Sequence, residues 1–413
     1  MLEASGPGNR KDRAPLAGIR VLEVGNYFAS PFCGMQLADL GAEVIKVEPP
    51  DGGDQVRSMA PLVDGEGSTF LRLNRNKRSF ALNLKAVEGK EVFRKLVRTA
   101  DVIVENLRPG TMADLELGHE ALRQLNPGLI YVAASGWGQD GPLSAQPGLD
   151  IMAQARSGLM SITGTPDGDP VKVGVPVTDL VCALYGALAA VSALYARRET
   201  GLGQFIDVCL LETGVSLAIW EAGRFFATGE IPRPEGSAHQ SNAPYQAFRS
   251  ADGWVTIGAT TPPNWNGFCR ALGLERLLDD PRYTDTSLRY RHRDTLIPVI
   301  EDVIIKQPTA YWLDLLERAG VPCAPIEHFD EVFSDPHLSA RDYFWDAPHP
   351  TLGPVRQLGS PMRFSRTPVR RGKAGPLLGE DSSALLAELG YAPAEIEALF
   401  ERRVARGPAQ VSS

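Results

Sequence analysis

The strongest constraint on the fold is the alternation of short apolar runs with helix-period segments along residues 16–140. Runs such as IRVLEV (19–24) end at glycine or proline and are typical of buried strands. The segments between them carry apolar residues at helical spacing. Strands that alternate with helices predict a parallel, doubly wound α/β sheet. The predicted strands cover 19–24, 43–47, 79–84, 101–105 and 129–134, and the predicted helices cover 31–40, 87–99 and 120–125.

The second half of the chain follows a different pattern. After Thr178 we expect a helix to about residue 198, a strand over 205–210 and a helix over 212–228. Residues 229–247 are rich in Gly, Pro, Ser and Asn, as linkers are, and residues 321–375 resemble an extended return connection. The predicted organisation is a disordered tail (1–15), a large α/β domain (16–200), a connecting strand and helix (201–228), a small α+β domain (229–325), and a return segment with the C-terminal part of the large domain (326–413).

Two common phosphate-binding motifs are absent from the sequence. The first strand-to-helix turn reads GNYFASP rather than GxGxxG, and no GxxxxGK[ST] occurs. The usual dinucleotide site and nucleotide hydrolysis therefore lack sequence support. An open parallel sheet still binds ligands beyond the carboxyl ends of its strands. Those ends lie at 26–29, 47–57, 106–110 and 135–138.

Charge and cysteine content limit the class of protein. The net charge of −8, from 42 basic and 50 acidic residues among 413, argues against nucleic acid as a partner. Five cysteines without a CxxC motif favour a reducing compartment, and the histidines show no metal-ligand spacing. The apolar run 180–196 is short for a membrane span, so we expect a buried core helix. We predict a cytoplasmic protein (mitochondrial matrix in a eukaryote) without metal or membrane association.

A series of motifs runs in one order through about 360 residues of the chain. It includes PLAGIRVLEV (15–24), LGAEVIKVEPP (40–50), NRNKRS (74–79), DVIVENLRPG (101–110), SGWGQDGP (135–142), VPVTD (175–179), APYQAF (243–248) and PLLGE (376–380). In these motifs the chain resembles the family III CoA-transferases, the superfamily of formyl-CoA transferase, carnitine CoA-transferase and α-methylacyl-CoA racemase. The resemblance implies a large Rossmann-like parallel-sheet domain built from both ends of the chain. It also implies a smaller inserted domain and an interlocked-ring homodimer.

The family's catalytic aspartate corresponds to Asp179. From the residues alone, an Asp before an apolar helix is a good N-cap, so capping and catalysis are both open. We expect the helix N-terminus to keep this carboxylate ionised, as a nucleophile for a thioester must be. The resemblance implies that Asp179 attacks an acyl-CoA, forms a mixed anhydride and then an aspartyl-CoA thioester, and passes CoA to an acceptor carboxylate. Coenzyme A is then a substrate, and no cofactor is permanently bound.

The resemblance also implies which segments contact CoA. They are Phe28 and Ala29; Leu82, Asn83, Leu84 and Lys85; Asn106, Leu107 and Arg108; and Ser135, Gly136, Trp137 and Gly138. Lys85 and Arg108 are the expected phosphate partners. Lys46, Lys77 and Arg78 are weaker candidates of the same kind. Each of these basic residues could instead be a solvated surface charge, and Trp137 either a cover for the ligand or a buried aromatic.

Two departures from family motifs narrow the function. Racemase members carry a His before Asp in a GHD motif, whereas this chain reads GLD (148–150). Leu149 cannot exchange a proton, which favours transfer over racemisation, while Asp150 is either a second polar site residue or a structural turn residue. The glycine loop of formyl-CoA transferase is replaced by GSAHQSNAPY (236–245), which resembles the dicarboxylate branch. Arg224, Arg233 or a histidine of the second domain could hold a distal carboxylate.

The sequence therefore predicts a CoA-transferase that moves CoA from succinyl-CoA or a similar donor to a small carboxylic or dicarboxylic acid. Two alternatives remain open. An acyl-CoA racemase or isomerase of the same fold would exchange the α-proton of an acyl-CoA without an acceptor acid. A non-catalytic CoA-binding protein would bind CoA with no role for Asp179.

Overall fold

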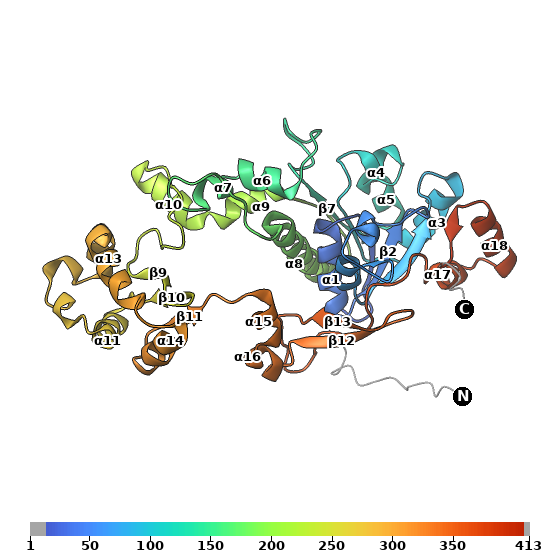
Figure 1. Ribbon diagram of the computed structural model, residues 1–413. Helices are drawn as coiled ribbons and strands as arrows, with labels where there is room; N and C mark the ends of the chain where they lie inside the picture. Colours follow the sequence, from blue (N-terminus) through green and yellow to red (C-terminus); the bar gives the residue numbers. More distant parts are fainter. Residues whose placement is uncertain (1–13, 409–413) are drawn as a thin grey trace. The chain divides into compact units, whose positions relative to one another are not determined.

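The computed structural model describes residues 14–408, which divide into two compact units (Figure 1). One unit comprises the chain up to Leu159, Val173–Ile219, and the chain from Ser339 on; the other comprises Met160–Lys172 and Trp220–Leu338. Most of the tail predicted for residues 1–15 lies outside the described residues. Ala14 already belongs to a turn, in which the Ala17 N–H donates to the Ala14 carbonyl over 3.0 Å.

The first unit is built on a seven-stranded sheet in the order β14-β5-β2-β1-β6-β7-β8. All neighbouring pairs are parallel except β14 with β5. The parallel part has the strand order 3-2-1-4-5-6 of a Rossmann-like sheet, so the predicted parallel α/β architecture is confirmed. The strands are β1 (Arg20–Val24), β2 (Glu43–Glu48), β5 (Arg78–Leu82), β6 (Val102–Glu105), β7 (Ile130–Ser135), β8 (Phe205–Cys209) and β14 (Ala405–Arg406).

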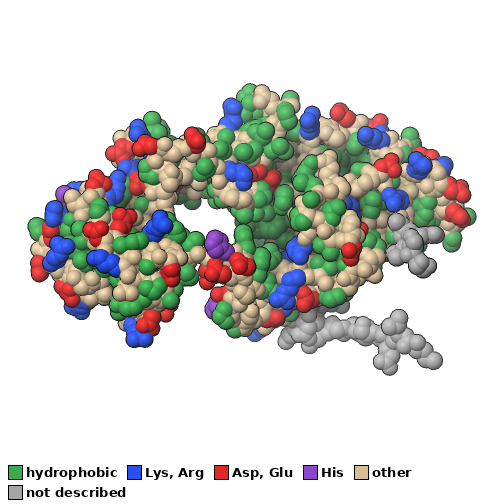
Figure 2. All heavy atoms as spheres, viewed as in Figure 1, with side chains coloured by type: hydrophobic (Ala, Val, Ile, Leu, Met, Phe, Trp, Pro, Cys, Tyr) green, Lys and Arg blue, Asp and Glu red, His purple; other side chains and the backbone are tan. Residues whose placement is uncertain are grey.

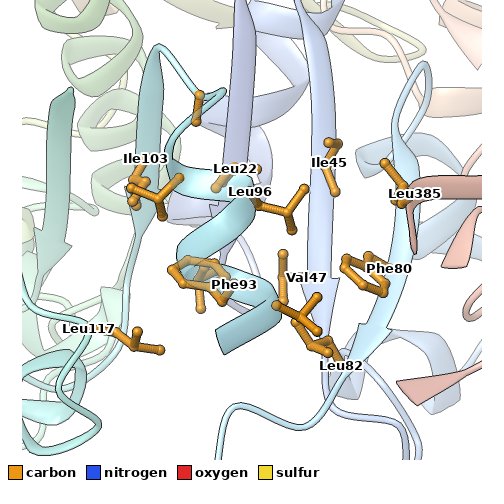
Figure 3. Packing of buried hydrophobic residues seen from close by; sticks show 14 of the residues in the cluster. Leu22, Ile45, Val47, Phe80, Leu82, Phe93, Leu96, Ile103, Leu117 and Leu385 are labelled. Carbon is orange, nitrogen blue, oxygen red and sulfur yellow. The ribbon is translucent and has the colours of Figure 1, made fainter. Parts of the chain in front are cut away.

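Helices cover both faces of this sheet, because its central strands are buried on both sides. On one face Phe93 and Leu96 of α3 belong to one buried cluster with Ile103 and Phe80 of the sheet, and Leu385 of α17 lies beside Phe80 in the same cluster (Figure 3). The helices of the unit are α1 (Ala29–Asp39), α2 (Ser68–Leu73), α3 (Val87–Val97), α4 (Thr111–Asp114), α5 (His119–Leu125), α6 (Asp150–Arg156), α8 (Val177–Thr200), α9 (Leu210–Leu217), α17 (Ser382–Glu388) and α18 (Pro393–Glu401). A 3-10 turn (Gln55–Ser58) and the hairpins β3 (Leu62–Val63) with β4 (Glu66–Gly67) and β12 (Phe344–His349) with β13 (Gly353–Leu358) complete it.

Helix α8 is long and apolar enough to cross a membrane by length and composition. One of its faces, with Ala183, Ala187 and Ala190, packs into the core together with Cys33 and Leu37 of α1. The expected buried core helix is therefore found on this face only. The opposite face exposes hydrophobic side chains, which gather over α8 in Figure 2. They are Leu184, Tyr185, Leu188 and Tyr195.

The second unit contains a three-stranded antiparallel sheet in the order β11-β10-β9. Helices pack on it around a core that includes Phe248, Trp265, Phe268 and Trp312. The strands are β9 (Tyr245–Arg249), β10 (Trp254–Gly258) and β11 (Cys323–Pro325). The helices are α11 (Pro262–Leu272), α12 (Thr286–Arg291), α13 (Arg293–Ile304), α14 (Thr309–Arg318) and α15 (Phe329–Ser334), with 3-10 turns at Glu275–Leu277 and Pro281–Tyr283. Helices α7 (Leu159–Ile162), α10 (Ile219–Thr228) and α16 (Pro336–Ala340) span the points where the chain passes between units.

The boundaries of the units differ from those expected from the sequence. Strand β8, expected to connect domains, pairs with β7 as an edge strand of the main sheet. The helix expected over 212–228 is divided into α9 and α10, and the expected extended return contains α15, α16 and the β12–β13 hairpin. Residues 160–172 belong to the second unit. These differences depend on pairing between distant segments, which the local pattern of residues does not encode.

Candidate active site

Four segments expected to contact CoA follow parallel strands of the first unit. Residues 28–29 follow β1, 82–85 include the end of β5 and the turn after it, 106–108 follow β6, and 135–138 include the end of β7. Because these strands are parallel, their carboxyl ends lie at one edge of the sheet. The strand order reverses between β1 and β6, the point at which open α/β sheets form a ligand crevice. The fold therefore brings the four segments to the edge suited to a ligand.

Asp179 is the third residue of α8 and lies inside its first turn. Its side chain is half-buried. Within residues 14–408 no hydrogen bond or ion pair ends on its carboxylate. The N-cap alternative for Asp179 is therefore wrong, because the N-cap position belongs to Pro176.

The N-terminus of α8 is held by Asp150, the first residue of α6. One Asp150 oxygen, Oδ1, accepts hydrogen bonds from the Thr178 backbone N–H (2.9 Å) and the Thr178 hydroxyl (2.7 Å). The other, Oδ2, accepts from the Gln154 amide over 2.7 Å. A side chain of α6 thus accepts a hydrogen bond from a free N–H in the first turn of α8. The Asp179 carboxylate does not cap this N–H.

The pKa of Asp179 is raised from 3.8 to about 7, first by burial and second by the negative charge of Asp150. The expectation that the helix N-terminus keeps this carboxylate ionised is therefore wrong near neutral pH. Desolvation and a nearby like charge both favour the protonated form of the carboxyl.

Small apolar side chains form a buried cluster that includes Cys182 of α8, three residues after Asp179. Ala29 of α1, Ala134 of β7, Ala153 of α6 and Cys182 of α8 form one buried cluster with Leu210. This cluster brings Ala29, an expected neighbour of the thioester, close to the turn that carries Asp179. Burial also raises the pKa of Cys182 to about 12, so this thiol stays protonated and is a poor nucleophile. Of these two side chains, the Asp179 carboxylate is the better candidate for a reactive group.

Comparisons with known proteins identify the family. Residues 16–382 match CoA-transferase family III. The chain belongs to this family. It is 39% identical to mouse succinyl-CoA:glutarate CoA-transferase over 388 residues, which cover 94% of this chain and 89% of that protein. It is also 39% identical to succinyl-CoA:mesaconate CoA-transferase of Haloarcula hispanica, covering 91% of this chain and 96% of that protein.

A solved structure has the same fold. The CAIB/BAIF family protein from Brucella suis superposes with a TM-score of 0.82 at 36% identity, covering 91% of this chain and 100% of that one. The family resemblance inferred from the motifs is confirmed, and the protein is a transferase.

In this family III CoA-transferase the turn after β7 supports the chain that leads to Asp150. Ser135 Oγ accepts the Gly138 N–H over 3.0 Å, and the Trp137 indole N–H donates to the Pro147 carbonyl over 3.3 Å. A Cβ on Gly136 would lie 2.9 Å from the Cα of Gly148, so only glycine allows this approach. These contacts fix the segment 147–150, and Trp137 remains partly exposed.

The basic residues predicted to bind the CoA phosphates divide into exposed and buried ones. Lys85 and Arg108 are exposed near the carboxyl-end edge of the sheet and remain candidates for phosphate binding. Lys46 and Lys77 are fully buried and pair with the two oxygens of Glu23, at 2.8 and 2.7 Å. As phosphate partners these two lysines were wrong predictions, because their charges are satisfied inside the fold.

Arg78 also forms ion pairs within the fold. It pairs with Glu43 at 2.5 Å and with Glu388 at 2.8 Å, so the weaker prediction that Arg78 binds phosphate is also not supported.

The residues predicted to hold a distal carboxylate lie in the second unit. There Arg224 pairs with Glu230 at 2.7 Å, Arg233 is exposed, and the His239 ring stacks on Tyr245. A role of both arginines and His239 as partners of a distal carboxylate stays a prediction.

Sequence reasoning missed Glu105, the last residue of β6. Its Oε2 accepts the Leu107 N–H over 2.7 Å, so it contacts a segment expected to bind CoA. Burial is the main cause that raises its pKa to about 7. In the sequence Glu105 ends a predicted strand, and nothing in that pattern distinguishes a buried carboxyl from an exposed one.

Proposed function

We propose that this enzyme transfers CoA from an acyl-CoA, with succinyl-CoA as the expected donor, to a dicarboxylic acid through a thioester on Asp179. The observation that carries the proposal is the half-buried Asp179 carboxylate, which has no partner within residues 14–408. Relatives named for succinyl-CoA with glutarate and with mesaconate support this donor and a dicarboxylic acceptor.

The first half-reaction moves CoA onto the enzyme. An Asp179 oxygen attacks the thioester carbonyl, the C–S bond breaks, and CoA leaves as a thiolate. The resulting mixed anhydride joins Asp179 to the donor acyl group. The thiolate then attacks the Asp179 carbonyl carbon, which releases the donor acid as a carboxylate and leaves an aspartyl-CoA thioester.

The second half-reaction reverses this chemistry on the acceptor. The acceptor carboxylate attacks the aspartyl thioester and expels the thiolate, which forms a second mixed anhydride. The thiolate attacks the acceptor carbonyl, giving the new acyl-CoA and regenerating the Asp179 carboxylate. Nothing is oxidised or reduced and no net proton is consumed, so the balance of the reaction needs no ATP.

Burial gives Asp179 two properties that suit the nucleophile. A carboxylate removed from bulk water keeps less of its hydration shell, which otherwise must be displaced before attack. Its raised pKa also makes it a more basic nucleophile than an ordinary aspartate. The four CoA segments named above, with Lys85 and Arg108 toward the phosphates, would hold the thioester at the same edge of the sheet.

The homodimer, as interlocked rings, is part of the proposal. Its support is the exposed apolar face of α8, where Leu188 and Tyr195 are 62% and 72% exposed. Monomeric proteins rarely leave such contiguous apolar surface uncovered. Light scattering should give twice the chain mass, and a monomeric mass would contradict this part of the proposal.

The decisive experiment traps the covalent intermediate. Enzyme incubated with succinyl-CoA is treated with hydroxylamine or borohydride and mapped by mass spectrometry. Modification at Asp179 that depends on the donor supports the proposal, and modification at another residue overturns it. Asp114→Ala, at an exposed position in α4, is the matched control and should label normally.

The same preparation tests the racemase alternative. Deuterium incorporation at the α-carbon of an acyl-CoA, in heavy water without any acceptor acid, would favour racemisation or isomerisation. We expect no such exchange, because Leu149 stands where a proton-transferring histidine would be needed. Glutarate, mesaconate and a monocarboxylic acid of similar length should be compared as acceptors.

A further inference from the structure

The side chain of Asn106 links the two loops at the point where the strand order reverses. Its Oδ1 accepts the Asn26 backbone N–H over 3.0 Å, and its Nδ2 donates to the Asn26 carbonyl over 2.8 Å. Asn26 follows β1 and Asn106 follows β6, which are neighbouring parallel strands. One side-chain amide therefore fixes the separation of the two loops that border the crevice.

The fit around this link is tight. A Cβ on Gly25 would lie 2.2 Å from Asn106 Oδ1 and 2.7 Å from the Cβ of Ser30, so only glycine is accommodated. Ser30 adds a second connection to β6, because its hydroxyl donates to the Val104 carbonyl over 3.2 Å. The chain from 26 to 30 is thus attached at both of its ends, to Asn106 after β6 and to Val104 within β6.

Buried charges hold the same turn from the side of β2. Lys46 Nζ donates to the Gly25 carbonyl over 3.0 Å and pairs with Asp54 Oδ2 at 2.8 Å. Asp54 Oδ1 in turn accepts the Tyr27 N–H over 3.3 Å. Lys46 and Asp54 are both fully buried. The turn after β1 is therefore held both from the side of β6 and from the side of β2.

The anchored turn has an unfavourable backbone conformation. Tyr27 has a φ of 61°, in the left-handed region that residues other than glycine rarely adopt. Such a conformation persists only where the surrounding contacts determine it. Phe28 and Ala29, the expected neighbours of the thioester, follow Tyr27 directly, so the same contacts determine their positions.

We propose that Asn106 is a positioning residue, which acts on the reaction by holding the turn 25–29 and not by a side-chain bond to CoA. This rests on the proposed function, since Phe28 and Ala29 matter only if a thioester lies beside them. Loosening the turn would misplace the reacting groups, so it should lower kcat while the affinity for CoA remains.

The test compares two asparagines with the same type of bonding. Asn126 donates to the carbonyls of Val97 and Ala100 over 2.9 and 2.7 Å and accepts the Gly128 N–H over 3.1 Å, at the amino end of β7. Asn106→Ala should lower kcat for CoA transfer by about 10- to 100-fold, with an unchanged Kd for CoA in calorimetry. Asn126→Ala should lose similar thermal stability but keep kcat.

Two results would overturn the proposal. If Asn106→Ala weakens CoA binding and keeps kcat, the side chain binds CoA itself; if both quantities stay at the wild-type level, Asn106 has no role in positioning. Should Asn106→Ala not fold, Tyr27→Gly replaces it, because glycine suits this φ and keeps the chain folded. That variant should lower kcat without losing thermal stability, and an unchanged kcat contradicts the proposal.

Hydrogen exchange separates this proposal from the proposed function. The Asn26 amide should exchange faster in Asn106→Ala than in wild type or Asn126→Ala. If the wild-type protein transfers no CoA yet this difference is found, the function is wrong and the loop link stands. If transfer is found and the Asn26 amide is equally protected in all three proteins, the link is wrong and the function stands.

Discussion

The two halves of the main sheet differ in the ion pairing of their buried acidic side chains. Around β1, β2 and β5, Glu23, Glu48 and Asp54 are buried with Lys46, Lys77 and Arg57 as ion-pair partners. Burial alone would raise the pKa of Glu48, but the charge and hydrogen bonds of Arg57 lower it to about 2. Around β6, β7 and α8, Glu105 and Asp179 form no ion pair within residues 14–408, and both have a pKa raised to about 7.

This difference separates a supporting role from a reactive one. A buried carboxylate with a matched cation stays charged at all ordinary pH values and fixes the backbone around it. A buried carboxyl without a cation changes its charge near neutral pH and can react with an electrophile. The first half of the sheet thus holds the loop after β1 in position, and the second half carries the proposed nucleophile.

The largest expected effect comes from removing the proposed nucleophile. Asp179→Asn should reduce CoA transfer by about 10⁴-fold or more, because no other described group replaces it as the covalent carrier. The same change should raise the free energy of unfolding at pH 8, since it removes a buried charge that has no partner. Steady-state transfer and urea denaturation measure the two effects.

The opposite signs in activity and stability make this prediction specific. A variant that loses both activity and stability would mean that Asp179 is a structural residue like those around β2. Asp101→Asn, which breaks the Asp101–Arg197 pair of 2.6 Å away from the carboxyl-end edge, is the control and should keep activity.

Breaking the paired half should lower stability, and it should also lower kcat because Lys46 holds the turn 25–29 through the Gly25 carbonyl. Lys46→Met leaves Glu23 without one cation and Asp54 without its own, so we expect a loss of about 3–5 kcal/mol in the free energy of unfolding. Lys85→Met, at an exposed lysine, should change it by less than about 0.5 kcal/mol. Denaturant titration distinguishes them, and equal small losses would contradict the idea of a paired supporting half.

The sheet could be predicted from the sequence because strand runs are local patterns, and Asp179 became the proposed nucleophile because a short family motif surrounds it. The strand runs and the VPVTD motif are contiguous in the chain. The capping of α8 depends on the hydrogen bond from the Thr178 N–H to Asp150, which lies 28 residues earlier in the chain. No local sequence pattern predicts that contact. The raised pKa of Asp179 depends on burial and on the charge of the same Asp150, so the expected charge state of Asp179 was wrong.

The buried lysines were misjudged for a related reason. In EVIKVE (43–48) Lys46 alternates with apolar residues and resembles an outward-facing position of a half-exposed strand. A central parallel strand is covered on both faces, so Lys46 has no exposed side and needs the partners found at Glu23 and Asp54. The covering elements come from distant segments, which explains why the pattern alone did not reveal the pairing.

The pH dependence of transfer tests the reactive half directly. A carboxyl with a raised pKa must lose its proton before it can attack, so kcat/KM should rise about tenfold per pH unit below 7 and level off above it. Glu105 also has a pKa of about 7, so Glu105→Gln is the control. If the rise stays near pH 7 in that variant, it belongs to Asp179; if the rise vanishes, Glu105 is the group that titrates.

The smallest expected effect isolates the second cause of the raised pKa. Asp150→Asn removes the nearby charge but can still accept the Thr178 N–H, so the rise in kcat/KM should move to lower pH by a fraction of a unit. It should stay well above the ordinary aspartate value, because burial, the larger cause, remains. Thr178→Val removes the hydrogen bond from the Thr178 hydroxyl to Asp150 and keeps the charge of Asp150. In this variant kcat/KM should rise at the same pH as in the wild type. A shift in Thr178→Val without one in Asp150→Asn would mean that the bonding around α8, and not the charge of Asp150, controls the proton on Asp179.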